Sequence, residues 1–241
     1  MDFTKVKKII SNAKHLVVFT GAGISVESGI PPFTGNGGLW NKYDPKFIEL
    51  SYFFAHPENS WKEINKIFYE YMGKSKPNFA HTEIGRLSKE GVIKAVVTQN
   101  IDNLHQEGGA SNVIEFHGTT KTLICPKCKK HYLVTKEILK IIPPKCKNCG
   151  EVLKPNFIFY GEQIDPQIHD NAFDTIVKAD VLLIIGTSGQ VMPANSLPYL
   201  AKQENKDIKI IEVNPEKSTF TDAIVDLYFS MKATEFFKKI K

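Results

Sequence analysis

Uncharged amides, a carboxylate and a histidine follow a largely apolar run in the middle of this 241-residue chain. Residues 92–97 lead directly into Gln99, Asn100 and Asp102, and His117 follows beside a glycine. In an open α/β sheet, ligands bind in the crevice at the carboxyl ends of the strands. Amides can orient hydroxyl and carboxamide groups, and a histidine titrates near neutral pH. The pattern therefore predicts a polar ligand site, at which His117 either moves a proton or is a structural histidine.

A glycine-rich turn follows a second apolar run, residues 16–20, which is typical of a strand buried on both faces. The turn reads Gly21-Ala22-Gly23, and a further glycine stands at position 29. A strand, a glycine turn and a helix together form the context in which backbone N–H groups hold a phosphate. The spacing G-x-G-x5-G differs from the G-x-G-x2-G of ordinary dinucleotide-binding dehydrogenases. A tight turn without a ligand is the alternative.

The only four cysteines of the chain are Cys125, Cys128, Cys146 and Cys149. Their C-x2-C-x17-C-x2-C spacing is typical of a zinc site with four thiolate ligands. Two disulfides or a redox motif are the alternatives, and a cytosolic chain with every cysteine in the matched pattern disfavours both. Four protein ligands leave the metal no open position, so we expect the zinc to be structural.

Composition and charge indicate an ordinary globular protein, with 42% hydrophobic and 24% charged residues. No apolar run approaches the roughly 18 to 20 residues that span a bilayer. The first ten residues resemble an amphipathic helix and not a signal peptide, so we expect a cytoplasmic protein without a membrane partner. Residues 121–154 carry nine lysines and two acids, a pattern that can favour nucleic acid. We interpret these lysines as solubilising the zinc module, and we do not expect direct nucleic-acid binding.

The order of the predicted elements indicates an α/β fold with a parallel sheet and helices on both faces. Helices are predicted over 3–13, 45–90, 166–178, 193–204 and 233–240, and strands over 16–20, 92–98, 181–186, 208–213 and 224–229. Asn78 is the predicted N-cap of the last helix in 45–90. We expect residues 1–118 and 156–241 to form a Rossmann-like domain, and 119–155 to form a zinc-binding module. A helical insertion at about 40–75 would belong to the smaller domain.

Seven stretches, in family order, resemble the sirtuin family of NAD-dependent protein deacylases, and the resemblance covers the chain from about residue 4 to 240. They are Gly21–Pro31, Thr98–Asp102, Glu115–Gly118, the two C-x2-C pairs, Phe157–Glu162, Gly186–Pro198 and Glu212–Glu216. The resemblance implies NAD as cofactor beside the zinc. It also implies an acylated lysine of a protein or peptide as substrate.

The resemblance also implies a role for individual residues. His117 is the implied general base, with Gln99 and Asn100 beside it as further catalytic residues. A substrate peptide would lie as an added β-strand against Ile158, Phe159, Tyr160, Gly161 and Val191. The implied contacts to NAD come from Gly21, Ala22, Gly23, Ser25, Phe33, Thr34, Gln99, Asn100, Ile101, Asp102, Gly186, Thr187, Ser188, Asn214, Pro215, Glu216 and Ala233.

Two departures from the family pattern bear on the predicted reaction. Pro32 and Thr34 replace the usual Asp and Arg of Gly-Ile-Pro-Asp-Phe-Arg, which removes a cation near the ribose and the diphosphate. Ile64 and Ile67 stand near the Tyr-x-x-Arg pair with which some sirtuins bind acidic acyl groups. We therefore predict removal of a neutral acyl group, acetyl or longer, with nicotinamide, free lysine and O-acetyl-ADP-ribose as the products of deacetylation. Thr34 keeps an ADP-ribosyltransferase or NAD glycohydrolase as the alternative, and a non-enzymatic NAD-binding scaffold is a third.

Overall fold

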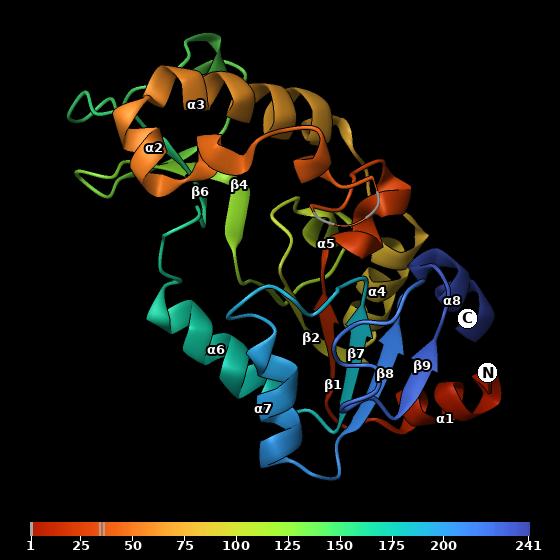
Figure 1. Ribbon diagram of the computed structural model, residues 1–241. Coiled ribbons are helices and arrows are strands. Elements are labelled where there is room, and N and C mark those ends of the chain that lie inside the picture. The colour runs from red at the N-terminus through yellow and green to blue at the C-terminus, as the bar shows by residue number, and fades with distance from the viewer. Residues whose placement is uncertain (1, 34, 36) are drawn as a thin grey trace.

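A six-stranded parallel sheet forms the centre of the larger lobe in this computed structural model, which describes residues 2–33, 35 and 37–241 (Figure 1). The strand order is β3-β2-β1-β7-β8-β9. The direction of strand progression reverses between β1 and β7, and such a switch point creates a crevice at the carboxyl ends of the strands. The strands are β1 Leu16–Thr20, β2 Ile93–Thr98, β3 Val113–Glu115, β7 Val181–Ile185, β8 Lys209–Val213 and β9 Leu227–Phe229.

Helices cover both faces of this sheet, which confirms the predicted α/β fold (Figure 1). Every residue of β1 and β7 is buried, because their apolar and β-branched side chains pack against helices above and below the sheet. One face carries α1 Phe3–Asn12, α4 Phe79–Lys89 and α8 Ala233–Ile240, and the other carries α6 Pro166–Val177 and α7 Ser196–Glu204.

Asn78 is the N-cap of α4, as predicted, and it links the helix to the glycine turn. Its Oδ1 accepts hydrogen bonds from the N–H groups of Ala80 at 2.9 Å and His81 at 3.4 Å. In return, the Asn78 N–H donates to His81 Nδ1 at 3.3 Å, which completes a capping box. The Asn78 Nδ2 donates to the Ile24 carbonyl at 2.7 Å. The cap therefore fixes both the start of α4 and the turn that follows β1.

The smaller lobe contains a three-stranded antiparallel sheet in the order β5-β4-β6, packed against two short helices. Trp61 is fully buried in its core and donates from Nε1 to the Leu153 carbonyl at 2.7 Å. Strand β4 begins directly after His117, and β6 leads back to the larger lobe. The elements are α2 Leu50–Ala55, α3 Pro57–Ile64, β4 Gly118–Ile124, β5 His131–Leu133 and β6 Lys154–Phe157.

The structure divides the region 45–90, which was predicted to be largely helical, into several shorter elements. Residues 45–48 and 72–74 are 3₁₀ turns, 65–71 form a π-helix, and residues 75–78 are not helical before α4 begins. Pro57 starts α3, and Pro77 disfavours a helical conformation at the residue before it. Local proline constraints therefore divide the helical pattern.

Other boundaries also differ from the prediction. The turn after β1 continues as a 3₁₀ helix over Ala22–Ser28 and ends at Gly29, whose φ is 87°. Helix α7 begins at 196 and not 193, and β9 begins at 227 and not 224. Strand β3 and the short helix α5 Leu104–Glu107 were not predicted, because three or four residues show no clear hydrophobic period.

Within the described ranges, no helix combines the length and the apolar character needed to cross a bilayer.

Gly85 of α4 provides a test of the packing that supports the site. A Cβ at this position would overlap the Gly108 carbonyl oxygen, so Gly85→Ala must push α4 away from the segment after α5. We expect it to lower the free energy of unfolding by about 1–3 kcal/mol, as overpacking does. Gly73→Ala is the control, since its Cβ would lie 3.6 Å from the nearest atom, the Phe68 carbonyl oxygen. Urea unfolding of both variants measures the difference, and equal stabilities would contradict this interpretation.

Candidate active site at the carboxyl edge of the sheet

A cavity of about 850 Å³ opens at the carboxyl ends of the strands, where the larger and smaller lobes meet. Its volume is within the range of small-molecule and cofactor sites. Most of the residues predicted to bind NAD or substrate line this cavity. They are Gly21, Ala22, Gly23, Phe33, Gln99, Asn100, Ile101, His117, Ile158, Phe159, Tyr160, Gly161, Gly186, Thr187, Ser188, Val191, Asn214, Pro215, Glu216 and Ala233.

Backbone hydrogen bonds just beyond the strands hold these residues at one edge. The Gly21 N–H donates to the Ile185 carbonyl at 3.0 Å, and the Gln99 N–H donates to the Thr20 carbonyl at 2.9 Å. The first residue after β1 is thereby tied to β7, and the first residue after β2 is tied to β1. The same register therefore fixes both the glycine turn and the amide side chains.

Two glycine turns meet at the floor of the cavity. The Gly23 N–H donates to the Gly186 carbonyl at 2.8 Å, and Gly186 has a φ of +62°. A Cβ on Gly23 would lie 2.7 Å from the Gly186 Cα, closer than real Cβ atoms approach. The close approach therefore requires glycine at both positions, and it presents bare backbone to the cavity. A phosphate-bearing ligand fits such a wall.

A buried polar network lies behind Asn100. Ser25 Oγ donates to Asp102 Oδ2 at 2.7 Å and accepts from Asn100 Nδ2 at 3.2 Å. The His81 Nδ1 accepts the Asn78 N–H, so the neutral ring carries its proton on Nε2, which lies 3.4 Å from Ser25 Oγ. The network fixes the orientation of the Asn100 amide.

Ser25 and Asp102 lie in this network, and neither is among the residues that line the cavity. Ser25 is fully buried. Burial raises the pKa of the Asp102 carboxyl, and the hydrogen bonds from Ser25 and the Leu104 N–H oppose that shift. Thr34, also a predicted NAD contact, lies outside the described residues.

His117 faces the cavity with a defined tautomer. Its Nδ1 lies 3.0 Å from the Gln99 carbonyl oxygen, which can only accept, so Nδ1 carries the proton. The neutral ring therefore leaves Nε2 free to accept a proton. Burial lowers the pKa of His117, and the hydrogen bond to Gln99 opposes that shift. The imidazole is consequently neutral at pH 7 and suited to act as a base.

The Gln99 side chain connects neighbouring strand ends. Its Nε2 donates to Thr187 Oγ1 at 3.0 Å, and Asn214 Nδ2 donates to the Thr187 carbonyl at 3.3 Å. Polar groups from the ends of β2, β7 and β8 thus form one continuous hydrogen-bonded edge. With the glycine turn after β1, the structure brings together the four strand ends at which the sequence places glycine or polar residues.

The segment after β6 forms the wall between the lobes. The Ile158 N–H donates to the His117 carbonyl at 2.9 Å. The Tyr160 N–H donates to the Ile48 carbonyl at 2.9 Å, and the Tyr160 carbonyl accepts from the Leu50 N–H at 3.0 Å. The Tyr160 backbone therefore already pairs with the smaller lobe. Gly161 follows at the cavity with a φ of +84°.

Aromatic and aliphatic side chains that were not predicted as site residues also line the cavity: Trp40, Ile48 and Phe68. Trp40 packs against Phe33 and Tyr160, with ring-centroid distances of 5.4 and 6.4 Å. The aromatic residues of the loop around Trp40 were a signal that could have identified it. No sequence signal identified Ile48 and Phe68, because they belong to the smaller lobe and do not follow a strand of the parallel sheet.

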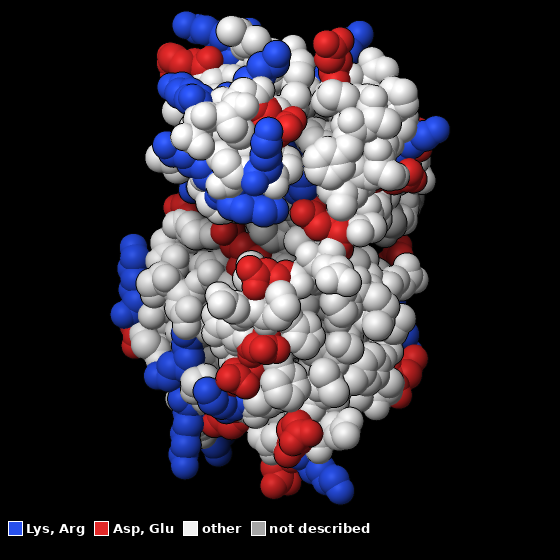
Figure 2. All heavy atoms as spheres, turned by 90° about the vertical axis from the view of Figure 1, so that its left-hand side faces the viewer, with Lys and Arg blue, Asp and Glu red and all other residues white. Residues whose placement is uncertain are grey.

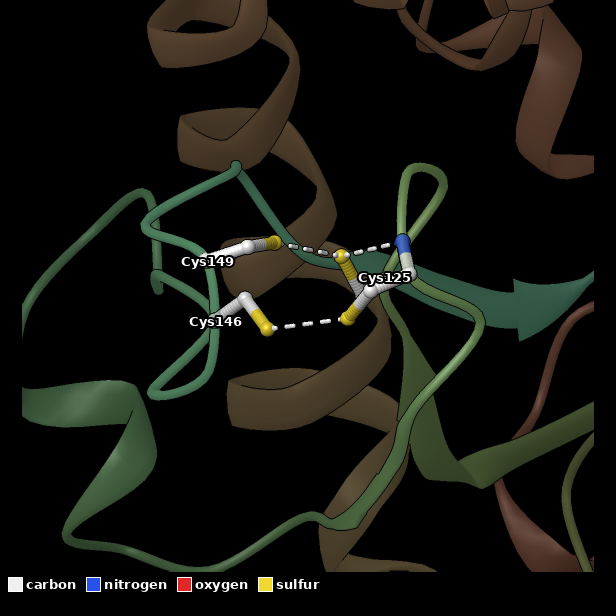
Figure 3. A group of neighbouring side chains, drawn as sticks. Cys125, Cys146 and Cys149 are labelled. Atoms are coloured by element: carbon white, nitrogen blue, oxygen red, sulfur yellow. Dashed lines mark hydrogen bonds between the residues drawn. The ribbon is translucent and has the colours of Figure 1, made fainter.

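The four cysteines converge between two matching turns (Figure 3). Each C-x2-C pair is followed by a left-handed residue, Lys129 with φ 61° and Gly150 with φ 76°. The N–H groups of these two residues donate to the carbonyls of Cys125 and Cys146, both at 2.9 Å. The two turns therefore have the same geometry and direct their sulfur atoms to a common centre.

The sulfur positions fit a zinc ion. All four Sγ atoms lie within 4.8 Å of one another, and the pairs Cys125–Cys149 and Cys128–Cys146 are 3.5 and 3.6 Å apart. Tetrahedral coordination with Zn–S bonds of about 2.3 Å requires sulfur separations of about 3.8 Å. None of the four cysteines forms a disulfide in the structure, which disfavours that alternative. The cysteines are grouped as in a zinc site.

Removal of one zinc ligand tests this assignment. We expect Cys146→Ser to lose bound zinc and to melt at a markedly lower temperature, because structural zinc contributes folding free energy directly. Atomic emission and thermal denaturation measure the two effects. Lys147→Ser, in the same turn, is the control and retains metal and stability. A Cys146→Ser protein with wild-type metal content and melting temperature would contradict a structural zinc.

The buried His81 predicts a loss of stability in mild acid. Burial lowers its pKa from 6.5 to about 4, so the unfolded chain binds the proton more readily than the folded protein. The free energy of unfolding therefore falls as the pH drops below 6.5, and this loss levels off near pH 4. From pH 7 to pH 5 we expect His81 to account for about 2 kcal/mol of the decrease.

Urea unfolding of wild type and His81→Asn at pH 7 and pH 5 measures this contribution as the difference in pH dependence. His131→Asn, which replaces an exposed histidine, is the control and should retain the wild-type pH dependence. An identical pH dependence in wild type and His81→Asn would refute the assignment.

Comparisons with known proteins agree with this architecture. Residues 21–193 match a model of the Sir2 family. The chain is 40% identical to an NAD-dependent protein deacylase of Pyrococcus abyssi, covering 98% of this chain and 95% of the relative. It is also 40% identical to the NAD-dependent protein deacylase 1 of Archaeoglobus fulgidus, covering 96% and 93%.

Solved structures extend the comparison to the fold. A Sir2 homolog–NAD complex superposes with a TM-score of 0.91 at 38% identity, covering 100% of this chain and 92% of that one. A Sir2–p53 peptide–NAD⁺ structure superposes with a TM-score of 0.90 at 32% identity, covering 100% and 97%. On the family match, the identities and the shared fold, this chain belongs to the Sir2 family.

Proposed function

We propose that the protein is an NAD-dependent protein-lysine deacylase that removes a neutral acyl group, with acetyl as the first candidate. The observation that carries this proposal is the position of His117. His117 lines a cavity that a bare glycine turn and an apolar wall also line, and its Nδ1 hydrogen bond leaves Nε2 free to accept a proton. The relatives named as NAD-dependent protein deacylases support the same assignment.

In this proposal the strand ends hold the nucleotide. The glycine turn at Gly21 and Gly23 leaves backbone available to the diphosphate, and Thr187 and Asn214 lie toward the adenosine half. The Asn100 amide, fixed by Ser25, orients the carboxamide of nicotinamide, and Asp102 acts through that serine. When bound, NAD supplies a ribose carbon that becomes electrophilic as nicotinamide leaves, and the acyl oxygen of the lysine attacks it.

His117 then accepts a proton from a ribose hydroxyl through Nε2. The Gln99 carbonyl holds the ring in the required tautomer through Nδ1, and burial keeps the ring neutral at pH 7. Gln99 therefore serves twice, since its amide also hydrogen-bonds Thr187 beside the nucleotide. Together, NAD, the acetyl-lysine and one water give nicotinamide, free lysine and O-acetyl-ADP-ribose, because water breaks the bond between the acyl carbon and the lysine nitrogen.

The wall between the lobes suits an uncharged acyl group. Ile48, Phe68, Phe157 and Phe159 contribute apolar surface to the cavity. Ile64 and Ile67, which stand near the position of an acid-binding pair in some sirtuins, are buried in the same apolar core. An acyl carboxylate would find no compensating charge among these side chains. A peptide would enter across the mouth between Gly161 and Val191, as an added strand.

Peptide-dependent release of nicotinamide tests the proposal. We expect wild-type protein to release nicotinamide from NAD only with an acetyl-lysine peptide, with O-acetyl-ADP-ribose detected by mass spectrometry. His117→Ala should lower kcat about 10²- to 10⁴-fold, the usual contribution of a general base. His56→Ala, at an exposed histidine of the smaller lobe, is the control and should keep wild-type activity.

Two other outcomes of this assay would support the alternative functions. Nicotinamide release that does not depend on the peptide would support the NAD glycohydrolase or ADP-ribosyltransferase alternative. NAD binding without any turnover would support the scaffold alternative. Either result would contradict deacylation.

A further inference from the structure

One lysine of the basic zinc segment differs from all the others. Lysine side chains gather on one side of the upper lobe in Figure 2, as expected for a solvated face. Of the nine lysines between 121 and 154, eight are exposed, whereas Lys154 is buried with 4% exposure. Lysine is almost never fully buried unless it is paired. The position of Lys154 at the start of β6 therefore requires a specific explanation.

The Lys154 ammonium has an acceptor for each of its three N–H donors. Nζ donates to the Pro155 carbonyl at 2.9 Å and to the Phe157 carbonyl at 2.7 Å, and it lies 3.0 Å from Glu162 Oε2. It also lies 4.2 Å from the centroid of the Phe159 ring. The charge is thus enclosed by the chain segment that leads from β6 to Glu162.

Glu162, at the other end of this segment, hydrogen-bonds back to Phe159. Its Oε2 accepts the Phe159 N–H at 2.9 Å, and its own N–H donates to the Phe159 carbonyl at 3.0 Å. One carboxylate oxygen therefore joins the ammonium of Lys154 to the turn that contains Tyr160 and Gly161. Glu162 also lines the cavity.

This segment contacts both the catalytic base and the smaller lobe. Ile158 donates to the His117 carbonyl, and Tyr160 pairs with Ile48 and Leu50. Lys154 and Glu162 flank these two attachments along the chain, and their ion pair joins the two ends of the segment. Gly161, the residue next to Glu162, lines the cavity where the proposed substrate strand would bind.

We propose that Lys154, through its ion pair with Glu162, is a positioning residue that holds residues 157–162 in the shape required to pair with the substrate peptide. This inference rests on the proposed deacylase function, because it specifies how that function obtains its peptide site. A peptide that adds as a strand needs backbone donors and acceptors at fixed spacing. Nucleotide contacts come from other strand ends, so the pair acts on the peptide and not on NAD.

Lys154→Met tests the proposal, since it keeps an unbranched side chain and removes the charge and all three donors. We expect the KM for an acetyl-lysine peptide to rise about tenfold or more, which corresponds to about 1.4 kcal/mol, with the Kd for NAD unchanged. Lys154→Arg should recover part of the loss, because it restores the positive charge. Lys136→Met, the same change at an exposed lysine of this segment, is the control and should leave both constants at wild-type values.

Glu162→Gln provides a second variant that retains an acceptor for the Phe159 N–H while removing the ion pair. It should also raise the peptide KM, and it keeps the test available if Lys154→Met does not fold. Amide hydrogen exchange gives a readout that needs no turnover. Exchange over residues 157–162 should accelerate in both variants, while exchange over β7 should match wild type.

The possible outcomes separate the two proposals. A peptide KM at the wild-type value in both variants, or unchanged exchange over 157–162, would overturn the positioning role. A parallel rise in the peptide KM and the NAD Kd would also overturn it, because that pattern indicates general loss of structure. Wild-type protein without peptide-dependent turnover would instead count against the deacylase function, and the exchange measurement would still decide whether the pair orders the segment.

Discussion

The register of the parallel sheet is the constraint on which the site depends. The hydrogen bonds from Gly21 to Ile185 and from Gln99 to Thr20 continue the ladder by one residue beyond the strands. They fix the positions of the glycine turn and of Gln99 relative to the neighbouring strands. A shift of one residue in either strand would turn every side chain to the opposite face and dismantle this edge. The six-stranded sheet therefore stabilises the fold and also aligns the site.

Strands β4 and β6 join the cysteine cluster to His117, the proposed general base. Strand β4 lies between His117 and Cys125, and β6 lies between the second cysteine pair and Ile158, whose N–H donates to the His117 carbonyl. The cysteine cluster and His117 thus lie at opposite ends of the antiparallel pair formed by β4 and β6. Lys154, at the start of β6, forms its ion pair with Glu162 beyond the end of that strand. A structural metal outside the cavity can in this way influence the geometry inside it.

Much of the fold could be predicted because the buried strands are short, apolar and β-branched, and glycine or polar residues end them. The α/β class, the cap at Asn78 and the grouping of the cysteines were all predicted correctly. The breaks within 45–90, the short strand β3 and the 3₁₀ form of the turn after β1 were not. Those features depend on packing between the lobes and on single prolines, and a hydrophobic period averaged over several residues does not record them.

The sequence by itself determined which polar residues end the strands and that four thiolates share one spacing, because both follow from order along the chain. Only the tertiary structure decided that His117 leaves Nε2 free, that Ser25 and Asp102 lie behind Asn100, and that Lys154 is the buried lysine among nine. Each of these depends on a contact with a group supplied by another part of the fold: the Gln99 carbonyl, the Asn100 amide and the Glu162 carboxylate. Such contacts form only when the chain closes on itself, and a linear pattern does not specify their geometry.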